Sequence, residues 1–316
     1  MTTNERYLVT GGAGFIGSNL VEALVSASHP VRVIDNLSTG RIENLGDLMS
    51  GIEFIEADLT DPEAARAAAA DIDVVFHQAA LPSVPRSVAD PVASNHANVN
   101  ATLNLLVASR DAGVRRLVFA SSSSIYGDTP TLPKIETMTP SPLSPYAVAK
   151  LASEYYCQVI ASLYGLETVS LRYFNVFGPR QNPDSQYSAV IPKFIKRYLE
   201  SNPPTIDGDG EQTRAFAYID NVVHANLRAA VAEGVSGEIF NISVDTRMSL
   251  NALDETLRRL IEAAPGVQPT YGPPRAGDIK HSFADISKAN RMLGYTPSVS
   301  TEEGLRRTVE WYRKAT

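Results

Sequence analysis

The first half of the chain alternates short apolar runs, rich in β-branched residues, with longer amphipathic stretches. Runs such as Val74-Val75-Phe76 are apolar at every position, as buried parallel strands are. The pattern predicts strands over Tyr7–Thr10, Val31–Ile34, Glu53–Glu56, Val74–His77, Leu117–Ala120 and Thr168–Arg172. It predicts helices over Gly17–Ser26, Pro62–Ala70, Asn98–Ala112 and Pro145–Tyr164. Strands that alternate with helices in this way form an α/β fold around a doubly wound parallel sheet.

The rhythm changes after about Gly178, where Pro and Gly become denser and the alternation is lost. We therefore expect one domain over residues 1–178 and a smaller, mixed α/β lobe over residues 179–316. Ala217–Ile219 and Glu238–Ile242 have the character of strands. Segments near residues 215–245 could thus return to the first domain.

Charge and cysteine content exclude several classes of protein. The 316 residues carry a formal net charge of −7, whereas nucleic-acid-binding proteins need a surplus of Lys and Arg. A single cysteine, Cys157, excludes an internal disulfide, and the five histidines lack metal-binding spacing, so we expect no metal. The polar start resembles no signal peptide, and no apolar run is long enough to span a bilayer. We expect a cytoplasmic protein that binds neither nucleic acid nor membrane.

A glycine-rich turn joins the first predicted strand directly to the first helix. Gly11, Gly14 and Gly17 form a GxxGxxG pattern, with Phe15 and Ile16 between the last two. Glycines allow a tight turn and close backbone approach, while the helix start offers free N–H groups to a pyrophosphate. This strand–turn–helix context predicts a Rossmann-type dinucleotide site in the domain over residues 1–178.

An acidic residue after the second strand indicates which dinucleotide is bound. Asp35 can accept hydrogen bonds from an adenosine ribose and would repel a 2′-phosphate, so we expect NAD rather than NADP. Further candidates for the same site follow the second, third and fourth strands: Asn36, Ser38, Gly40, Asp58, Leu59, Ala79 and Ala80. The carboxyl ends of such strands are where open α/β sheets bind ligands.

Candidate catalytic groups follow further along the chain. Tyr146 and Lys150 are four residues apart on a predicted helix, so they share one face. A neighbouring ammonium and an oxidised nicotinamide would both lower the pKa of the phenol, which favours a general base. Such a pair is common by chance. The run Ser121–Ser124, just past a predicted strand, supplies hydroxyls that could hold a reacting oxygen near the phenol.

With the glycine turn, the serine run, Tyr146 and Lys150, the chain resembles an extended short-chain dehydrogenase/reductase, and within that family the nucleotide-sugar 4-epimerases. The resemblance covers nearly the whole chain. It implies that Tyr146 is the base and that Lys150 also binds the nicotinamide ribose. Ser122 is implied to be the hydroxyl partner, supported by Ser123 or Ser124.

The same resemblance implies substrate contacts, mainly in the lobe over residues 179–316. Leu171–Pro179 resembles the family segment in which Tyr173 lies near the nicotinamide and Asn175 contacts a diphosphate. Segment 189–194 would flank uracil, Arg214 and Arg275 would clamp the diphosphate, and Asp278 would bind a ribose. The implied substrate residues are Ser83, Arg86, Ser122, Asn175, Ala189, Val190, Lys193, Arg214, Arg275, Asp278 and Ser282.

Missing acids narrow the reaction. Related 4,6-dehydratases carry an Asp-Glu pair where Ser123 and Ser124 stand, and uronate decarboxylases typically carry Glu at the position of Ser124. Epimerisation at C4 through a 4-keto sugar is therefore the best interpretation. By the resemblance, Ser282 stands where family members with a bulky residue exclude an N-acetyl group. A small serine there should leave room for it, which favours UDP-GlcNAc/UDP-GalNAc with UDP-glucose/UDP-galactose as a second pair.

Alternatives stay open at this point. UDP-glucuronate 4-epimerases carry similar serines, and Arg86 could meet a carboxylate. A decarboxylase or dehydratase with another acid, an oxidoreductase that releases NADH, and a non-catalytic NAD-binding scaffold are further readings. The resemblance also implies a homodimer through the helices Asn98–Ala112 and Pro145–Tyr164, which their amphipathic pattern allows.

Overall fold

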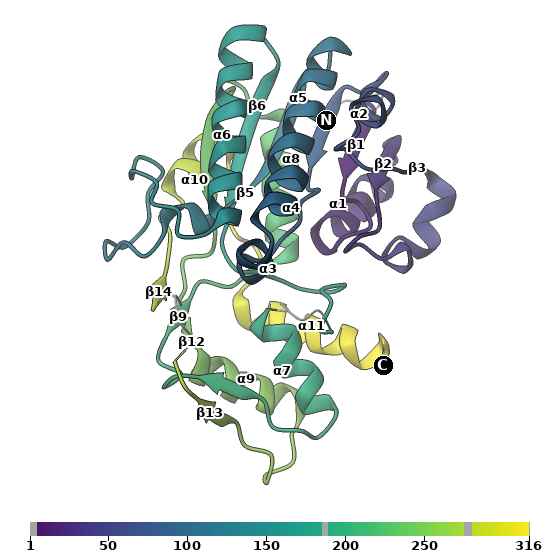
Figure 1. The fold of residues 1–316 in the computed structure, drawn as a ribbon. Coiled ribbons are helices and arrows are strands. Elements are labelled where there is room, and N and C mark those ends of the chain that lie inside the picture. The colour runs from purple at the N-terminus through teal and green to yellow at the C-terminus, as the bar shows by residue number, and fades with distance from the viewer. Residues whose placement is uncertain (1–4, 185–188, 275–279, 316) are drawn as a thin grey trace.

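A seven-stranded parallel sheet forms the centre of the larger part of the molecule (Figure 1). The computed structural model describes residues 5–184, 189–274 and 280–315. The strand order is β11-β6-β5-β4-β1-β2-β3. The strands are β1 Tyr7–Thr10, β2 Val31–Asp35, β3 Ile52–Glu56, β4 Val74–His77, β5 Arg116–Ser122, β6 Glu167–Tyr173 and β11 Glu238–Ile242. Chain order reverses between β1 and β4, which places a ligand crevice at their carboxyl ends.

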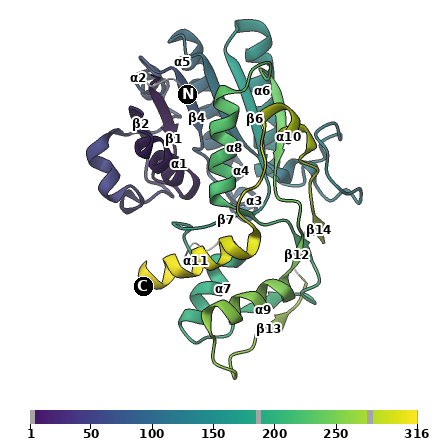
Figure 2. The ribbon, with the colours of Figure 1, turned by 180° about the vertical axis from the view of Figure 1, so that it is seen from behind.

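Helices cover both faces of this sheet (Figures 1 and 2). One face carries α1 Phe15–Ser26, α8 Ile219–Val231 and α10 Ser287–Leu293, and the other carries α2 Pro62–Ala69, α5 Ala101–Asp111 and α6 Pro145–Tyr164. The inner strands β1, β2 and β4 are buried on both sides, and their side chains alternate between two cores: in β1, Tyr7 and Val9 join one core and Leu8 the other. The predicted Rossmann-type α/β fold is confirmed.

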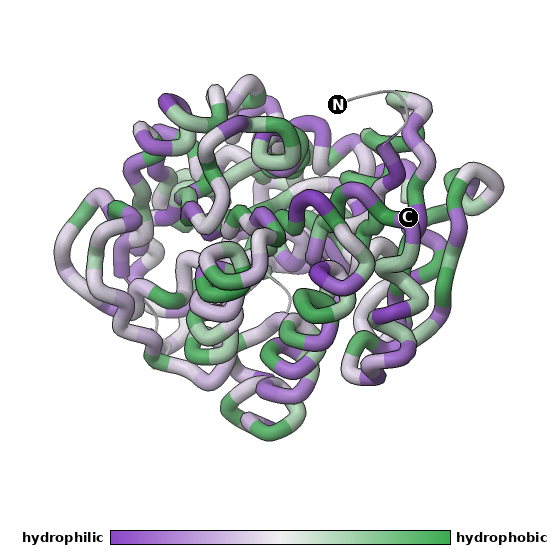
Figure 3. The backbone as a smooth tube through the Cα atoms, turned by 90° about the horizontal axis from the view of Figure 1, so that it is seen from above, coloured by the Kyte–Doolittle hydropathy of each residue, from purple (hydrophilic) through white to green (hydrophobic). Residues whose placement is uncertain are grey.

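The predicted helices are present, with one difference. The helix expected from Asn98 begins earlier, because α3 Val84–Ala89 leads into α4 Pro91–Asn95 and a π-helical turn η3 at His96–Asn100 before α5. Single-turn helices also occur at η1 Ile42–Asn44, η2 Gly46–Gly51 and η4 Ser123–Tyr126. Seen from above, the helices change between hydrophobic and hydrophilic residues within each turn (Figure 3), as helices with one buried side do.

A smaller lobe of mixed structure lies below the carboxyl ends of the strands (Figure 1). Its helices are α7 Val190–Leu199, α9 Leu250–Ile261 and α11 Thr301–Ala315. Its short strands are β8 Thr205–Asp207 with β13 Thr270–Gly272, and β9 Thr213–Arg214 with β12 Met248–Ser249 and β14 His281–Ser282. Within the described residues, no helix combines the length and the apolar character that crossing a bilayer requires.

The two segments predicted as returning strands pair with different partners. Glu238–Ile242 forms β11 and pairs with β6 at the edge of the main sheet. Ala217–Ile219 does not reach that sheet: Ala217–Tyr218 forms β10, which pairs with β7 Val176–Phe177, and Ile219 opens α8. The expected strand is therefore present over Ala217–Tyr218, but it pairs with β7 rather than with the main sheet, because its short apolar run continues into an amphipathic helix.

Candidate active site

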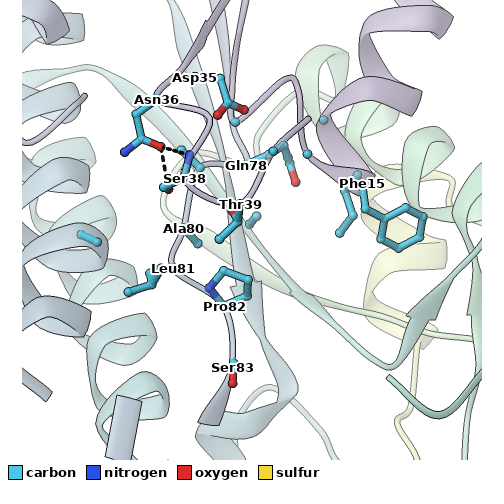
Figure 4. Close-up of a pocket in the computed structure, with 18 of the residues that line it drawn as sticks. Phe15, Asp35, Asn36, Ser38, Thr39, Gln78, Ala80, Leu81, Pro82 and Ser83 are labelled. Carbon is cyan, nitrogen blue, oxygen red and sulfur yellow. Dashed lines mark hydrogen bonds between the residues drawn. The ribbon is translucent and has the colours of Figure 1, made fainter. Parts of the chain in front are cut away.

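One cavity of about 710 Å³ lies at the carboxyl ends of the central strands. All predicted cofactor residues line it: Gly11, Gly14, Phe15, Ile16, Gly17, Asp35, Asn36, Ser38, Gly40, Asp58, Leu59, Ala79, Ala80, Tyr146, Lys150 and Tyr173. Figure 4 shows Asp35, Asn36 and Ser38 at one end, and the segment from Ala80 to Ser83 running away from them. The cavity is therefore elongated, as a dinucleotide requires.

The glycine turn needs glycine for steric reasons. Gly11 has a φ of +65°, and a Cβ there would lie 2.7 Å from the Cα of Ala79. A Cβ on Gly17 would lie 2.1 Å from the carbonyl oxygen of Gly11. No side chain caps the start of α1. Gly14 to Gly17, which line the cavity at this point, therefore keep backbone N–H groups that can bind an anion.

Asp35 is held with its carboxylate fixed at the cavity. Its two oxygens accept hydrogen bonds from the backbone N–H of Ala13 at 3.0 Å and of Leu37 at 2.8 Å. Burial raises the pKa of this carboxyl, while the two N–H groups lower it. Each oxygen keeps a free lone pair, so the group can still accept from ribose hydroxyls.

The catalytic candidates meet where β5 ends beside the start of α6. Ser122 forms a hydrogen bond with the Tyr146 hydroxyl that lowers the pKa of the phenol. The same Ser122 oxygen accepts from the backbone N–H of Ser124 at 3.2 Å, which orients its own hydroxyl. The hydroxyl of Ser124 is buried without a hydrogen-bond partner among the described residues. Ser123 opens the η4 turn beside it.

The pKa of Tyr146 depends mainly on burial. Burial raises it to about 12, whereas the hydrogen bond with Ser122 lowers it. The ammonium of Lys150 lies 5.9 Å from the centre of the tyrosine ring and donates to the carbonyl of Ala120 at 2.8 Å. Burial also lowers the pKa of Lys150 to about 8.

Tyr173 closes another side of the cavity. Its hydroxyl contacts the side-chain oxygens of Gln78 at 3.2 Å and Asn226 at 3.0 Å, and it lies 2.8 Å from the amide nitrogen of Asn226. Burial raises its pKa to about 12. Gln78 and Asn226 escaped the sequence analysis, although Gln78 immediately precedes the predicted Ala79.

The predicted substrate residues are only partly gathered at this cavity. Ser83, Arg86 and Ala189 line it. Six others do not: Ser122, Asn175, Val190, Lys193, Arg214 and Ser282, of which Lys193 is exposed on α7. Arg275 and Asp278 lie outside the described residues.

Two of these residues sit together in the small sheet of the lower lobe. Arg214 and Ser282 are cross-strand partners in β9 and β14. Asn175, with a φ of +36°, donates to the carbonyl of Ala215 at 3.1 Å.

The segment after the predicted Leu171–Pro179 contributes residues that the sequence analysis missed. Arg180, Gln181 and Asn182 line the cavity. Within the described residues, Nη1 of Arg180 and Oε1 of Gln181 are buried without hydrogen-bond partners. The other end of the Arg180 guanidinium is paired with Glu22 on α1 at 2.6 Å. Buried polar atoms of this kind commonly face a ligand or water.

The residues present fit an oxidised nicotinamide dinucleotide. The turn at Gly11 and Gly17 leaves room for a backbone approach, Asp35 offers acceptors for a ribose, and Tyr146 with Lys150 stands at the far part of the same cavity. Among the described residues, no group of three or more His, Cys, Asp or Glu side chains could hold a metal ion.

Comparison with known proteins agrees with this geometry. Residues 7–243 match the family described as NAD dependent epimerase/dehydratase. A UDP-glucose 4-epimerase of Mycolicibacterium smegmatis is 39% identical over 312 residues, 98% of each protein. A UDP-glucuronate 4-epimerase of Thermodesulfobacterium geofontis is 37% identical over 319 residues, 98% of this chain and 96% of that protein. The solved structure of a UDP-N-acetylglucosamine 4-epimerase from Methanobrevibacter ruminantium, in complex with UDP-N-acetylmuramic acid, is 40% identical, with a TM-score of 0.95 and 100% of both chains covered. The chain therefore belongs to the NAD-dependent epimerase/dehydratase family, as an enzyme related to the UDP-sugar 4-epimerases of the extended short-chain dehydrogenase/reductase type.

Proposed function

We propose that this enzyme interconverts UDP-GlcNAc and UDP-GalNAc at C4, with UDP-glucose and UDP-galactose as a second pair. The observation that carries the proposal is the pairing of Ser122 with Tyr146 at the NAD cavity, beside a serine turn that contains no acid. The lower lobe, which residues 179–316 form apart from the segments that return to the main sheet, would bind the UDP-sugar, and residues 1–178 would bind most of NAD.

In this proposal Tyr146 removes the proton from the C4 hydroxyl while Ser122 holds the same oxygen. NAD, when bound, accepts the hydride from C4 and returns it to the opposite face, and its positive ring also lowers the pKa of the nearby phenol. After the 4-keto sugar has rotated in the site to present its opposite face, Tyr146 returns the proton to the C4 oxygen. The protein must therefore supply one reversible proton site and exclude water around it.

Other reactions would need groups that the serine turn does not offer. Elimination of water from the sugar needs a proton donor and a base near C5 and C6, and loss of a carboxylate would also use an acid in this turn. Ser123 and Ser124 occupy these positions in η4, and a hydroxyl near neutral pH serves neither role well. This favours epimerisation over dehydration or decarboxylation.

The rest of the nucleotide sugar would lie against the lower lobe. In the proposal, Asn175 and Arg214 meet the diphosphate, while Ala189, Val190 and Lys193 flank the uracil. Arg275 and Asp278 belong to the same proposal from their place in the sequence. Ser83 and Arg86 would face the sugar from the cavity side, where Ser83 accepts from the backbone N–H of Arg86 at 3.2 Å.

Ser282 would decide whether an N-acetyl group fits. It is half-buried on β14 and has the small side chain that an acetamide at C2 needs nearby. A tyrosine in its place would fill that space without touching Tyr146 or Lys150. Ser282→Tyr should therefore lose conversion of UDP-GlcNAc by roughly 100-fold while it keeps conversion of UDP-glucose.

The test is a panel of UDP-sugars given to the purified holoenzyme, with the C4 epimers resolved by NMR. Wild type should convert UDP-GlcNAc, Ser282→Ala should match it, and Ser282→Tyr should discriminate as stated. Equal turnover of both substrate pairs by Ser282→Tyr and wild type would refute the proposed role of Ser282 in admitting the N-acetyl group. Formation of a pentose, a 4-keto-6-deoxy sugar or stoichiometric free NADH would refute epimerisation itself.

UDP-glucuronate is the second candidate substrate. Arg86 lines the cavity and could pair with a C6 carboxylate, and a UDP-glucuronate 4-epimerase is among the relatives. The same panel includes UDP-glucuronate. Its preferential conversion, with loss in Arg86→Met, would replace the N-acetylhexosamine proposal.

We also propose a homodimer, formed by a second copy of this chain on α6. Val148, Tyr155, Val159 and Leu163 expose half or more of their surface along this helix. Val88 and Val92, on the adjoining α3 and α4, continue the apolar face. Helix α5 exposes no large apolar side chain, so we place the interface on α6 together with α3 and α4 rather than on α5. Leu163→Glu should yield monomers in sedimentation, whereas an unchanged dimer or a monomeric wild type would contradict the proposal.

A further inference from the structure

Helix α6 is attached to the end of β5 at three successive turns. Tyr146, Lys150 and Glu154 follow each other at four-residue intervals and so lie on one face of the helix. Tyr146 bonds to Ser122, Lys150 donates to the carbonyl of Ala120, and Glu154 accepts from the hydroxyl of Ser121. Three consecutive residues of β5 therefore meet three consecutive turns of α6.

The third attachment is the deepest. Glu154 and Arg172 form an ion pair whose side chains are 0% and 2% exposed. Nε and Nη2 of Arg172 donate to the two carboxylate oxygens of Glu154 at 2.9 and 2.8 Å, a forked geometry. Arg172 lies on β6, directly opposite Ser121 of β5. Glu154 thus fixes α6 against two adjacent strands at once.

The network continues away from the cavity. Nη1 of Arg172 donates to the hydroxyl of Tyr126 at 2.8 Å, and that hydroxyl donates to the side-chain oxygen of Asn241 on β11 at 2.7 Å. Each of the three nitrogens of the Arg172 guanidinium therefore donates to a buried partner. A fully satisfied buried network holds one geometry, because any displacement leaves a polar group without a partner.

Stability alone is a weak reason for such a pair. Taking two charges out of water offsets most of their attraction, and well-packed apolar residues of similar size often replace a buried ion pair at no loss. What the pair supplies is a fixed position of α6 relative to β5 and β6. That position determines how far Tyr146, on the helix, lies from Ser122, on the strand.

We propose that Glu154, clamped by Arg172, is a positioning residue that sets the distance between Tyr146 and Ser122 through the Ser121 contact. The proposal rests on the proposed function in so far as Tyr146 is the proton-transferring group. The charged groups around this junction are Lys150 and Glu154 on α6 and Arg172 on β6, with the buried His77 on β4 and the thiol of Cys157 on α6 nearby. The pKa of His77 falls to about 3, so this ring stays neutral.

Ser121→Ala is the most direct variant, because it removes the hydrogen bond between Ser121 and Glu154 and leaves the ion pair of Glu154 with Arg172 in place. Its matched control is Ser153→Ala. Ser153 is equally buried on the same helix, but its hydroxyl donates to the carbonyls of Ala149 and Asn98, neither of which belongs to β5 or β6. Glu154→Gln is the second variant, used if circular dichroism and bound NAD show that it folds like wild type.

Two readouts separate positioning from support of the fold. In the NAD-loaded enzyme, Ser121→Ala should lower kcat by roughly tenfold or more with KM within about twofold, because a small misplacement of reacting groups acts on kcat. Ultraviolet difference titration against the corresponding Tyr146→Phe protein should give a Tyr146 pKa raised by about half a unit or more, since Ser122 then bonds the phenolate less well. Ser153→Ala should change neither value.

A kcat and a Tyr146 pKa that match those of Ser153→Ala would overturn the proposal. A change confined to KM, or to NAD content, would also overturn it. The titration needs no sugar, so it decides the matter even for an enzyme that epimerises none of the tested UDP-sugars. Failure to epimerise any tested UDP-sugar would contradict the proposed function, but it would not contradict the positioning role.

Discussion

Two tyrosines face the same cavity from different regions of the molecule. Tyr146, at the start of α6, has a serine hydroxyl as its partner and a lysine one turn away. Tyr173, at the end of β6, is held between the side-chain amides of Gln78 and Asn226. Burial raises the pKa of both phenols to about 12. In the proposed function the same side chain exchanges a proton in one region, whereas in the other it is held in a fixed position by two amides.

The largest effect should come from removing the hydroxyl of Tyr146. Tyr146→Phe should lower kcat by roughly 1,000-fold with bound NAD unchanged, because the base is lost and the ring remains. Steady-state kinetics with a converted UDP-sugar and the absorbance of released NAD measure both quantities. Retention of a tenth of the wild-type kcat would mean that the base lies elsewhere.

A smaller loss is expected from Lys150→Met, about 100-fold in kcat. This variant removes the cation nearest Tyr146 and the bond to Ala120. Because the pKa of Lys150 lies at about 8, wild-type kcat should fall as the pH rises through that value and the ammonium loses its proton. The falling limb should be absent from the pH profile of Lys150→Met, and a limb that persists would have another origin.

Tyr173→Phe sharpens the comparison, because it makes the same chemical change in the other region. We expect kcat to fall by less than about tenfold, since the amide of Gln78 still donates to Asn226 at 3.0 Å and keeps the wall in place. The measurement is the same kinetic assay. A loss as large as that of Tyr146→Phe would erase the distinction between the two tyrosines.

The smallest effect concerns stability and should be alike in both regions. A phenol whose pKa is raised by folding stabilises the protein fully below its unfolded pKa of about 10, and this stability is lost as the pH rises through about 12. Tyr146→Phe and Tyr173→Phe should therefore each flatten the decline of the unfolding free energy above pH 10. Urea titrations at increasing pH test this, and a steeper decline in either variant would contradict the burial of that phenol.

The sequence was most informative where function depends on local order along the chain. Apart from Tyr146, Lys150 and Tyr173, the residues expected at the cofactor follow strands β1 to β4. The carboxyl ends of neighbouring parallel strands share one edge, so these residues line one cavity. Asn226 belongs to α8, which lies far along the chain and reaches Tyr173 only by packing on the sheet. No spacing in the sequence could have joined the two.

Protonation was the other property beyond reach of the sequence. The neighbour Lys150 could be read from the spacing of the helix, and its effect on Tyr146 was expected from charge alone. Burial of the phenol, and the turning of the ammonium toward Ala120, are consequences of tertiary packing. The pair of Glu154 and Arg172 escaped notice for the same reason, since a charged residue in an amphipathic helix usually faces solvent.

The path of the chain between the two lobes has a mechanical consequence. After β7 it descends to α7, rises through β10 to α8 and β11, descends again to α9, rises to α10 and ends below in α11 (Figures 1 and 2). Because the chain passes between the two lobes several times, opening them would require several connecting segments to move together rather than one hinge. We therefore expect ligands to enter and leave by rearrangement of short connecting segments, and grafting the lower lobe onto another scaffold would require every crossing to be rejoined.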